Sequence, residues 1–217
     1  MAAPDPAPLL ARVVVLAGPS GSGKSRLAER LGLPVLRLDD FYKDGDDPTL
    51  PRLDLAGGQP IVDWDSPGSW NHDAAVAALE ELCRTGRVDA PVYDLAHSAR
   101  TGHRVLDLDG ATLVVAEGIF AQEVVAGCAG RGLLAAAYCV TQHPVVTFAR
   151  RLSRDLRERR KPPLYLVRRG LHLLRAQRTV VARDASLGCE VCTPDEARRA
   201  VARLTDRPGP PSPASRR

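Results

Sequence analysis

The sequence predicts an α/β fold with a doubly wound, mostly parallel sheet and helices on both faces. Short apolar runs alternate with segments of helical periodicity, which is typical of a parallel sheet. The first run, residues 13–17, is followed by a glycine-rich loop and an amphipathic segment. The loop consists of Gly18, Pro19, Ser20, Gly21, Ser22, Gly23, Lys24 and Ser25. Strand, G-x-x-x-x-G-K-S loop and helix in this order form a phosphate-binding P-loop, so we expect a P-loop NTPase fold.

The residue types of this loop match its chemistry. Glycines let backbone N–H groups turn toward phosphate oxygens, and the N-terminus of the next helix adds partial positive charge. Lys24 can reach the β- and γ-phosphates, and the Ser25 hydroxyl can hold Mg²⁺. The loop therefore predicts binding of a nucleoside triphosphate, and we expect ATP and Mg²⁺ as cofactors.

A second parallel strand is expected at residues 34–38, and it ends at Asp39. In open α/β sheets, ligands bind at the carboxyl ends of the strands, which places Asp39 near the γ-phosphate. There it can accept the proton of an attacking hydroxyl, a role worth about 10²–10⁴ in rate. A helix cap or turn aspartate explains the same spacing equally well.

Residues 45–70 form a segment rich in glycine, proline and aspartate that is too long for a simple connection. It contains both tryptophans, Trp64 and Trp70, and an acid, Asp65, between them. An acid beside an aromatic ring suits a sugar or base that needs stacking and hydroxyl recognition. Tryptophans that fill a gap in the core are the competing interpretation.

The helix expected around residues 76–83 has an apolar face for the core. The strand at 112–116 ends in Glu117, a Walker B-like arrangement in which the carboxylate holds Mg²⁺ directly or through water. Residues 107–110 are expected to form a β-turn, since the chain has no N-K-x-D guanine motif. A helix and a strand at 133–140 complete the β-α alternation.

From residue 145 the chain becomes helical and basic, and two prolines end this helix at 162–163. Between Arg150 and Arg183 there are twelve basic residues and two acids. Because this block contains a single aromatic residue, a phosphate-facing lid at about 150–165 explains it better than a nucleic-acid surface. A second helix is expected from 164 to about 181, then a loop at 186–192. Thr193 and Glu196 form a capping box that begins the last helix.

At 217 residues the chain suits one α/β domain, which we place at 1–205, with a disordered proline-rich tail at 206–217. The N-terminus resembles no signal peptide, and the longest apolar run, 133–140, is too short to span a bilayer. We therefore expect a cytoplasmic protein. Five scattered cysteines argue against a disulfide framework.

Over residues 12–161 the chain resembles the uridine kinase (uridine-cytidine kinase) branch of the P-loop kinases. Besides the loop, the family's D-S-F-Y stands here as D-D-F-Y at 39–42, and its F-D-H-P-D as W-D-S-P-G at 64–68. P-V-Y-D and H-S recur within 91–98 and E-G at 117–118, and the family's lid motif R-D-x-x-E-R-x-R stands here as R-D-L-R-E-R-R-K at 154–161. Two local differences from the family are a Tyr93–His97 segment that is one residue shorter and bulkier rings around Asp65. The family's terminal strand with an aspartate is missing, and residues 181–192 take its place.

The resemblance implies that Asp39 is the catalytic base, that Asp65 binds ribose hydroxyls, and that Tyr93 and His97 contact the nucleobase. It also implies that Arg154, Arg159 and Lys161 serve the ATP phosphates. The residues expected to carry catalysis are thus Lys24, Asp39, Arg154 and Arg159. Those expected around the acceptor are Asp39, Tyr42, Trp64, Asp65, Tyr93 and His97, and those expected to hold the metal are Ser25 and Glu117.

We therefore expect a phosphotransferase that moves the γ-phosphoryl of ATP to an alcohol, foremost the 5′-hydroxyl of uridine or cytidine in pyrimidine salvage. Two alternatives stay open: the same chemistry on a sugar, a sugar phosphate or a pantothenate-like metabolite, and a nucleotide-binding regulatory module without turnover. The expected partner is a nucleoside-like small molecule, with neither nucleic acid nor membrane involved. Assembly into a homo-oligomer stays open.

Overall fold

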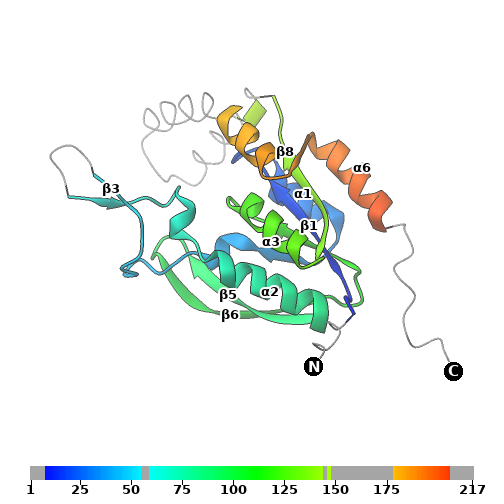
Figure 1. Cartoon of the computed structure of the whole chain (residues 1–217), viewed down its shortest axis with the longest axis horizontal. Coiled ribbons are helices and arrows are strands. Elements are labelled where there is room, and N and C mark those ends of the chain that lie inside the picture. The colour runs from blue at the N-terminus through cyan, green and yellow to red at the C-terminus, as the bar shows by residue number, and fades with distance from the viewer. Residues whose placement is uncertain (1–7, 55–58, 144–145, 148–177, 206–217) are drawn as a thin grey trace.

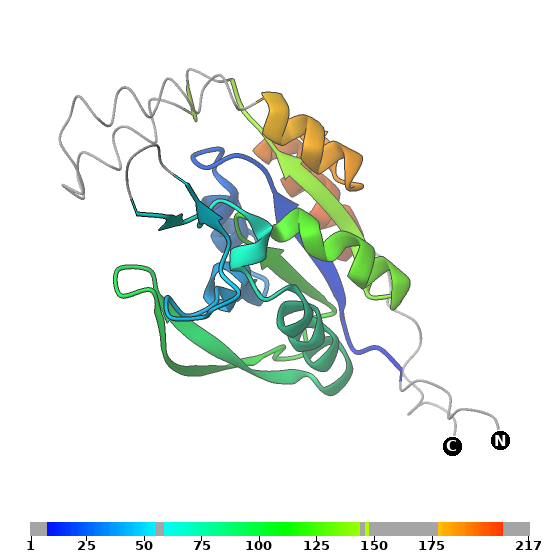
Figure 2. The same cartoon turned by 60° about the vertical axis from the view of Figure 1, so that its left-hand side comes forward.

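A computed structural model describes residues 8–54, 59–143, 146–147 and 178–205. It confirms the α/β prediction: helices pack on both faces of a five-stranded parallel sheet (Figures 1 and 2). The strand order is β2 (Val35–Arg37), β7 (Leu113–Glu117), β1 (Arg12–Ala17), β8 (Leu134–Val140) and β9 (Glu190–Cys192). The predicted lid and tail lie outside the described residues, as do Arg154, Arg159 and Lys161.

The strand β1 lies at the centre of the sheet. It pairs in parallel with β7 on one side and with β8 on the other. Residues 13–17 are fully buried, because this strand has sheet neighbours on both edges and helices on both faces. A continuous β-branched run is what such a position requires. The carboxyl ends of β1, β2 and β7 therefore meet at one edge, where Gly18, Leu38 and Gly118 follow them.

The two faces of the sheet have separate cores. On one face α1 (Lys24–Leu31) packs near α6 (Pro194–Thr205), and their apolar side chains cover Val14 and Leu16. On the other face α2 (His72–Thr85) and α3 (Val124–Gly130) cover Val13 and Val15. Successive residues of a strand point to opposite faces, which explains this division.

Two antiparallel ribbons lie outside the main sheet. The longer is a hairpin of β5 (Arg87–Asp94) and β6 (Ala99–Asp107), and β5 packs against α2. The shorter pairs β3 (Arg52–Leu53) with β4 (Ile61–Val62) within the segment read as a long loop. Short 3-10 turns at Leu38–Phe41 (η1), Pro67–Ser69 (η2) and Ala121–Glu123 (η3) complete the connections.

The C-terminal part differs from the sequence prediction. The prediction of a loop at 186–192 is wrong, because residues 190–192 form β9 and pair with β8. The helix expected to end near Val181 continues to residue 186. The capping box is confirmed: the Thr193 backbone N–H donates to Glu196 at 2.8 Å, and Glu196 N–H donates to the Thr193 hydroxyl at 3.3 Å. The turn at 107–110 is also confirmed, with a positive φ at Asp109 and Gly110.

All five cysteines are buried free thiols. Among the described residues no helix has the length and apolar character needed to cross a membrane.

Candidate active site

The P-loop begins where β1 ends. Gly18 has a φ of +127°, and a Cβ at this position would collide with the carbonyl oxygen of Val140 on β8. Only glycine allows the chain to turn here while it packs directly on the neighbouring strand. Gln142, just beyond β8, donates its side-chain amide to the Ser22 carbonyl at 3.1 Å. The loop is thus held from the β8 side as well as by its own turns.

Lys24 is the first residue of α1 and is only 9% exposed. Its ammonium group donates to the carbonyl of Gly18 at 2.6 Å and to that of Pro19 at 3.2 Å. Burial lowers the pKa of Lys24, and the nearby carboxylates of Glu117, Asp39 and Asp184 oppose this shift. A desolvated cation within the loop is suited to phosphate oxygens, which can replace the two carbonyls as acceptors.

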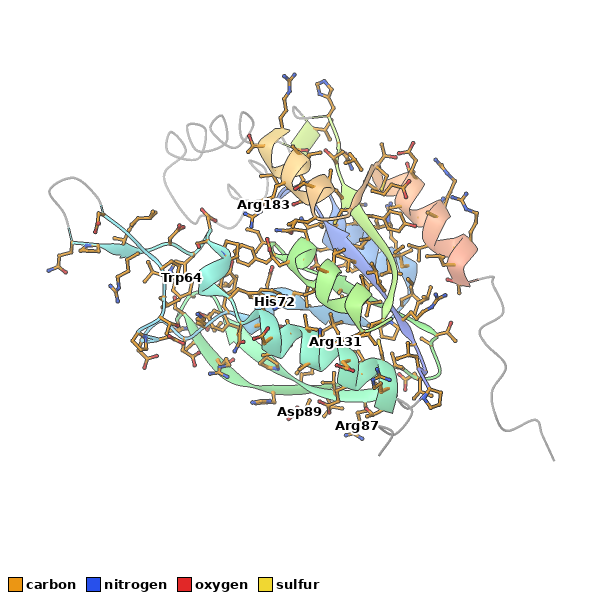
Figure 3. All side chains as sticks on the ribbon, in the orientation of Figure 1. Trp64, His72, Arg87, Asp89, Arg131 and Arg183 are labelled. Atoms are coloured by element: carbon orange, nitrogen blue, oxygen red, sulfur yellow. The ribbon has the colours of Figure 1, made fainter. Side chains whose placement is uncertain are left out.

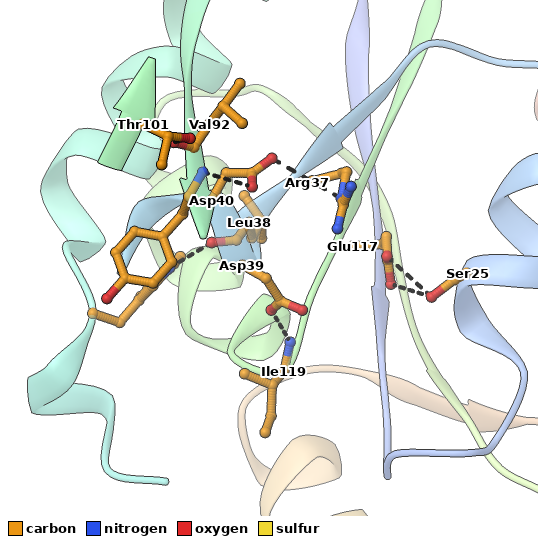
Figure 4. A network of polar contacts seen from close by, with 11 residues as sticks. Ser25, Arg37, Leu38, Asp39, Asp40, Val92, Thr101, Glu117 and Ile119 are labelled. Atoms are coloured by element: carbon orange, nitrogen blue, oxygen red, sulfur yellow. Dashed lines mark hydrogen bonds and ion pairs between the residues drawn. The ribbon is translucent and has the colours of Figure 1, made fainter. Parts of the chain in front are cut away.

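Ser25 and Glu117 point toward each other from α1 and from the end of β7 (Figure 4). The Ser25 hydroxyl donates to the two carboxylate oxygens of Glu117 at 3.1 and 3.3 Å. Burial raises the pKa of Glu117, and the charge of Lys24 counteracts it. A hydroxyl and a carboxylate in contact are the hard oxygen ligands that Mg²⁺ prefers, and this ion commonly keeps several waters besides one or two protein ligands. The pair therefore fits Mg²⁺ bound with a nucleotide.

The Asp39 carboxylate lies one strand away, within η1 at the end of β2. Its Oδ1 accepts the backbone N–H of Ile119 at 2.8 Å (Figure 4). Burial raises the pKa of Asp39, while the Ile119 N–H and the charge of Lys24 partly offset this effect. Arg37 pairs in register with Glu117, so the two acids follow neighbouring strands. The fold thereby brings a candidate base and a candidate metal ligand to one edge.

An aromatic cluster packs beside Asp39. The Tyr42 ring lies 5.8 Å from the Trp64 ring, 5.7 Å from Tyr93 and 5.9 Å from Phe120. The Tyr42 hydroxyl donates to the Trp64 carbonyl at 3.2 Å, and the Tyr93 hydroxyl donates to the Lys43 carbonyl at 2.8 Å. Both tyrosines are buried, and Trp64 is half-buried. The hydroxyls of Tyr42 and Tyr93, which are predicted to lie near the acceptor, thus donate hydrogen bonds to backbone carbonyls in this structure.

Asp65 and His97 are the exposed polar members of the predicted acceptor set. Burial raises the pKa of Tyr42, and the charges of Asp39 and Asp65 add to this shift. His97 lies at the tip of the β5–β6 hairpin, where its Nδ1 is 2.6 Å from a carboxylate oxygen of Asp94. The predicted acceptor set thus contains two exposed polar side chains, one in the segment after β4 and one at the tip of the hairpin.

The hairpin is attached to the segment after η1. Arg100 donates its backbone N–H and its guanidinium to Asp44, at 2.7 Å and at 3.0 and 3.2 Å. Gly45 N–H donates to the Ser98 carbonyl at 2.7 Å. These bonds set the position of His97 relative to Asp39.

Sequence reasoning missed several residues that shape the site. Asp40 is buried and accepts the Tyr93 N–H at 3.3 Å, so the second acid of the D-D pair holds the hairpin. Trp70 is buried and donates its ring N–H to the Leu38 carbonyl at 2.6 Å, which supports the core-filling interpretation for this tryptophan. Gly118 packs so closely that a Cβ there would lie 2.8 Å from Asp39 Oδ1. A single sequence contains no signal for these contacts, since each joins segments far apart in the chain.

A cavity of about 530 Å³ opens beside the Ser25–Glu117 pair. It lies between α1, β2 and β6, and Arg37 and Arg104 also line it. Among the described residues, no three His, Cys, Asp or Glu side chains form a cluster that could hold a metal by themselves. A metal here would thus depend on phosphate oxygens and water as well as on Ser25 and Glu117.

The chain is similar in sequence to known proteins of one family. The model of the phosphoribulokinase / uridine kinase family matches residues 13–162. Uridine kinase of Deinococcus deserti is 30% identical over 174 residues, which cover 75% of this chain and 77% of that protein. Uridine kinase of Schizosaccharomyces pombe is 33% identical over 157 residues, covering 68% of this chain and 32% of that protein.

A relative with another name also matches. Inorganic pyrophosphatase TTM2 of Arabidopsis thaliana is 32% identical over 116 residues, which cover 50% of this chain and 15% of that protein. The chain thus spans less than a third of the length of this relative and of the S. pombe enzyme. Two solved structures share the fold: a candidate fructose transport system kinase of Silicibacter sp. TM1040 and the circularly permuted kinase candidate YFH7 of Saccharomyces cerevisiae. The former has a TM-score of 0.55 at 18% identity and 89% and 91% coverage of the two chains, and the latter 0.57 at 12% identity and 85% and 92% coverage.

Proposed function

The chain is a P-loop kinase that belongs to the phosphoribulokinase / uridine kinase family, and we propose that it transfers the γ-phosphoryl group of ATP to a hydroxyl of a small molecule. The leading acceptor is the 5′-hydroxyl of uridine or cytidine. One observation carries this proposal: Asp39 and Glu117 stand at the ends of neighbouring strands, at the edge where the P-loop begins, and Glu117 contacts Ser25 of α1. A base, a metal pair and a phosphate cradle then meet around one transferring group.

In this mechanism the P-loop amides and Lys24 hold the triphosphate, and Ser25 and Glu117 hold Mg²⁺. The metal, when bound, neutralises charge that develops on the phosphate oxygens. Asp39 accepts the proton of the acceptor hydroxyl as it attacks the γ-phosphorus. Its contact with the Ile119 N–H leaves Oδ2 as the oxygen with which to do so. Arg154, Arg159 and Lys161 of the lid are proposed to add positive charge to the phosphates.

The same chemistry on another hydroxylated metabolite is a second candidate, and one observation favours it. The hydroxyls of Tyr42 and Tyr93 are bound to backbone carbonyls, so these groups are engaged before a nucleobase arrives. Asp65 and His97 then remain as polar groups for a smaller polyol, sugar or pantothenate-like acceptor. A regulatory module without turnover would have no use for a half-buried acid at the end of β2, which makes Asp39 the residue that separates these functions.

The test is a coupled ADP-release assay with Mg-ATP and a panel of acceptors. The panel contains uridine, cytidine, other nucleosides, pantothenate, and several pentoses with their phosphates. Turnover with pyrimidine nucleosides supports the leading proposal, and turnover only with another compound transfers the same mechanism to that acceptor. Tight Mg-ATP binding without turnover on any of them contradicts the proposed kinase activity and favours the regulatory module.

A further inference from the structure

Asp184 is a buried acid to which the proposed mechanism assigns no role. It lies on the helical segment 178–186, which follows the lid residues in the chain and is drawn in yellow-orange in Figure 1. It is 1% exposed. A carboxylate is rarely buried to this extent unless it has a partner or a task, because the loss of hydration is costly.

The contacts of Asp184 lead to the P-loop. Its Oδ2 accepts the thiol of Cys139 at 3.4 Å, and Cys139 pairs in register with Ala17, the residue before the loop. The next residue of β8, Val140, is the one whose carbonyl touches Gly18. Asp184 therefore contacts β8 next to the residue of this strand that packs on the P-loop.

Asp184 also acts on the P-loop lysine. Burial lowers the pKa of Lys24, and the charges of Glu117, Asp39 and Asp184 oppose this shift. Burial likewise raises the pKa of Asp184, and the Cys139 thiol and the charge of Lys24 counteract it. Glu117 and Asp39 face Lys24 from the β7 and β2 side of β1, whereas Asp184 is linked to β8 on the other side. The lysine thus has carboxylates on both sides.

Glu117, Asp39 and Asp184 have different roles in the proposed reaction. In the proposed mechanism Glu117 holds the metal and Asp39 takes up a proton, so the charge that each presents to Lys24 changes. Asp184 has neither task.

We propose that Asp184 is a positioning residue for the triphosphate: its buried carboxylate, fixed by Cys139, orients Lys24 and the adjacent end of the P-loop. The proposal rests on the proposed function, since it assumes that the loop receives ATP. It also gives the region after the lid a role, in the place of the family's terminal aspartate segment. Asp184 does not touch the reacting atoms, so it acts through Lys24 and β8.

The same helix has a second attachment that serves as a control. Arg183 donates to the Glu123 carboxylate at 2.7 Å, and its side chain is exposed, unlike that of Asp184 (Figure 3). Arg183→Gln therefore loosens the docking of the helix and leaves the buried acid in place. Asp184→Asn keeps the size of the side chain and removes its charge.

The experiment measures Mg-ATP affinity of the full chain by titration calorimetry, together with thermal unfolding. We expect Asp184→Asn to weaken Mg-ATP binding about tenfold. Its unfolding temperature should be unchanged or higher, because a desolvated charge is removed. In the kinase assay the KM for ATP should rise and the KM for the acceptor should not. Arg183→Gln should bind Mg-ATP within about twofold of the wild type.

Either of two results would overturn the proposal. The first is an unchanged Mg-ATP affinity in Asp184→Asn. The second is a loss of affinity in Arg183→Gln as large as that in Asp184→Asn, which would mean that Asp184 only docks the helix. If Asp184→Asn does not fold, Mg-ATP affinity is measured in Cys139→Ala instead. This variant keeps the Asp184 carboxylate and removes the hydrogen bond that the Cys139 thiol donates to it. An affinity loss of about threefold or more in folded Cys139→Ala supports the proposal, and a smaller loss overturns it. A wild-type chain that binds no Mg-ATP overturns the proposed function as well, whereas failure of the variants alone leaves that function standing.

Discussion

The Ser25 hydroxyl donates to both carboxylate oxygens of Glu117, at 3.1 and 3.3 Å, although 92 positions separate the two residues. This contact joins the first turn of α1 to the carboxyl end of β7. It brings together the two oxygen ligands that fit Mg²⁺, at the mouth of the P-loop.

The first prediction concerns this pair. Glu117→Gln should raise the Mg²⁺ concentration needed for half-maximal rate at least about tenfold and lower kcat by roughly 10². Ser25→Ala should act in the same direction, and the double variant should lose less than the product of the two effects, because both residues serve one ion. The measurement is initial rate against free Mg²⁺ at saturating ATP. Glu190→Gln, an exposed acid on β9, is the control. An unaltered Mg²⁺ dependence in Glu117→Gln would remove this residue from the metal site.

The second prediction concerns the candidate base. Asp39→Asn should lower kcat by about 10²–10⁴ and leave Mg-ATP affinity nearly intact, because the carboxylate is needed for proton transfer. Asp40→Asn is the matched control, since its amide oxygen can still accept the Tyr93 N–H. Steady-state kinetics give kcat for both variants, and titration with Mg-ATP gives their affinities. A large loss of ATP affinity with residual turnover in Asp39→Asn would contradict its role.

The pH dependence of this base has a defined sign. Burial raises the pKa of Asp39, and the base works only when it is deprotonated. The acidic limb of the rate profile should therefore lie above the range of an ordinary aspartate, about 4. The same burial makes the charged carboxylate less favourable in the folded chain than in the unfolded chain, a cost that is present above the usual aspartate range, about 4. Asp39→Asn should thus unfold at the same temperature as the wild type or higher, which separates lost catalysis from lost folding.

The third prediction tests the packing of Gly118 on Asp39. In Gly118→Ala the new Cβ would lie 2.8 Å from Asp39 Oδ1 and 2.9 Å from the Leu38 Cβ, so η1 must shift. We expect a loss of about 1–3 kcal/mol in unfolding free energy and a fall in kcat of about tenfold or more. Gly130→Ala is the control, because a Cβ there meets nothing within 4 Å. Full activity in Gly118→Ala would show that the position of Asp39 is not critical.

The fourth prediction concerns the attachment of the hairpin. Arg100→Ala removes the guanidinium from Asp44 and should free the tip that carries His97. The KM for the acceptor should rise severalfold while the KM for ATP stays the same. His103→Ala, an exposed change on the same strand, should alter neither value. Equal changes in both KM values would indicate general disruption instead.

This attachment also has an expected pH dependence. Hydrogen bonds from Arg100 hold the pKa of Asp44 below its ordinary value. The stabilisation is present at neutral pH and is lost as the pH falls through and below the usual aspartate range, about 4. Because both side chains are partly exposed, we expect a small effect, within about 1 kcal/mol. Unfolding of wild type and Asp44→Asn at pH 7 and pH 3 should show the difference between them shrink at the lower pH.

The sequence by itself was sufficient for the P-loop, the strands that flank it and the capping box of α6. Each is a contiguous pattern whose residue types are required by local geometry: glycines for the turn at Gly18, β-branched residues for β1, and Thr193 with Glu196 for the helix start. The acids Asp39 and Glu117 could be predicted as strand ends for the same reason.

Only the tertiary structure shows that the strand ends carrying Asp39 and Glu117 lie side by side, and which contacts keep them in place. The strand β9 has three residues and no periodicity of its own, so it is a strand only because β8 offers it a parallel edge. The roles of Asp40, Gly118 and Asp184 depend on contacts with segments remote in the chain. Such contacts depend on how layers pack, and packing is a property of the whole core, whereas a motif is a property of a few consecutive residues.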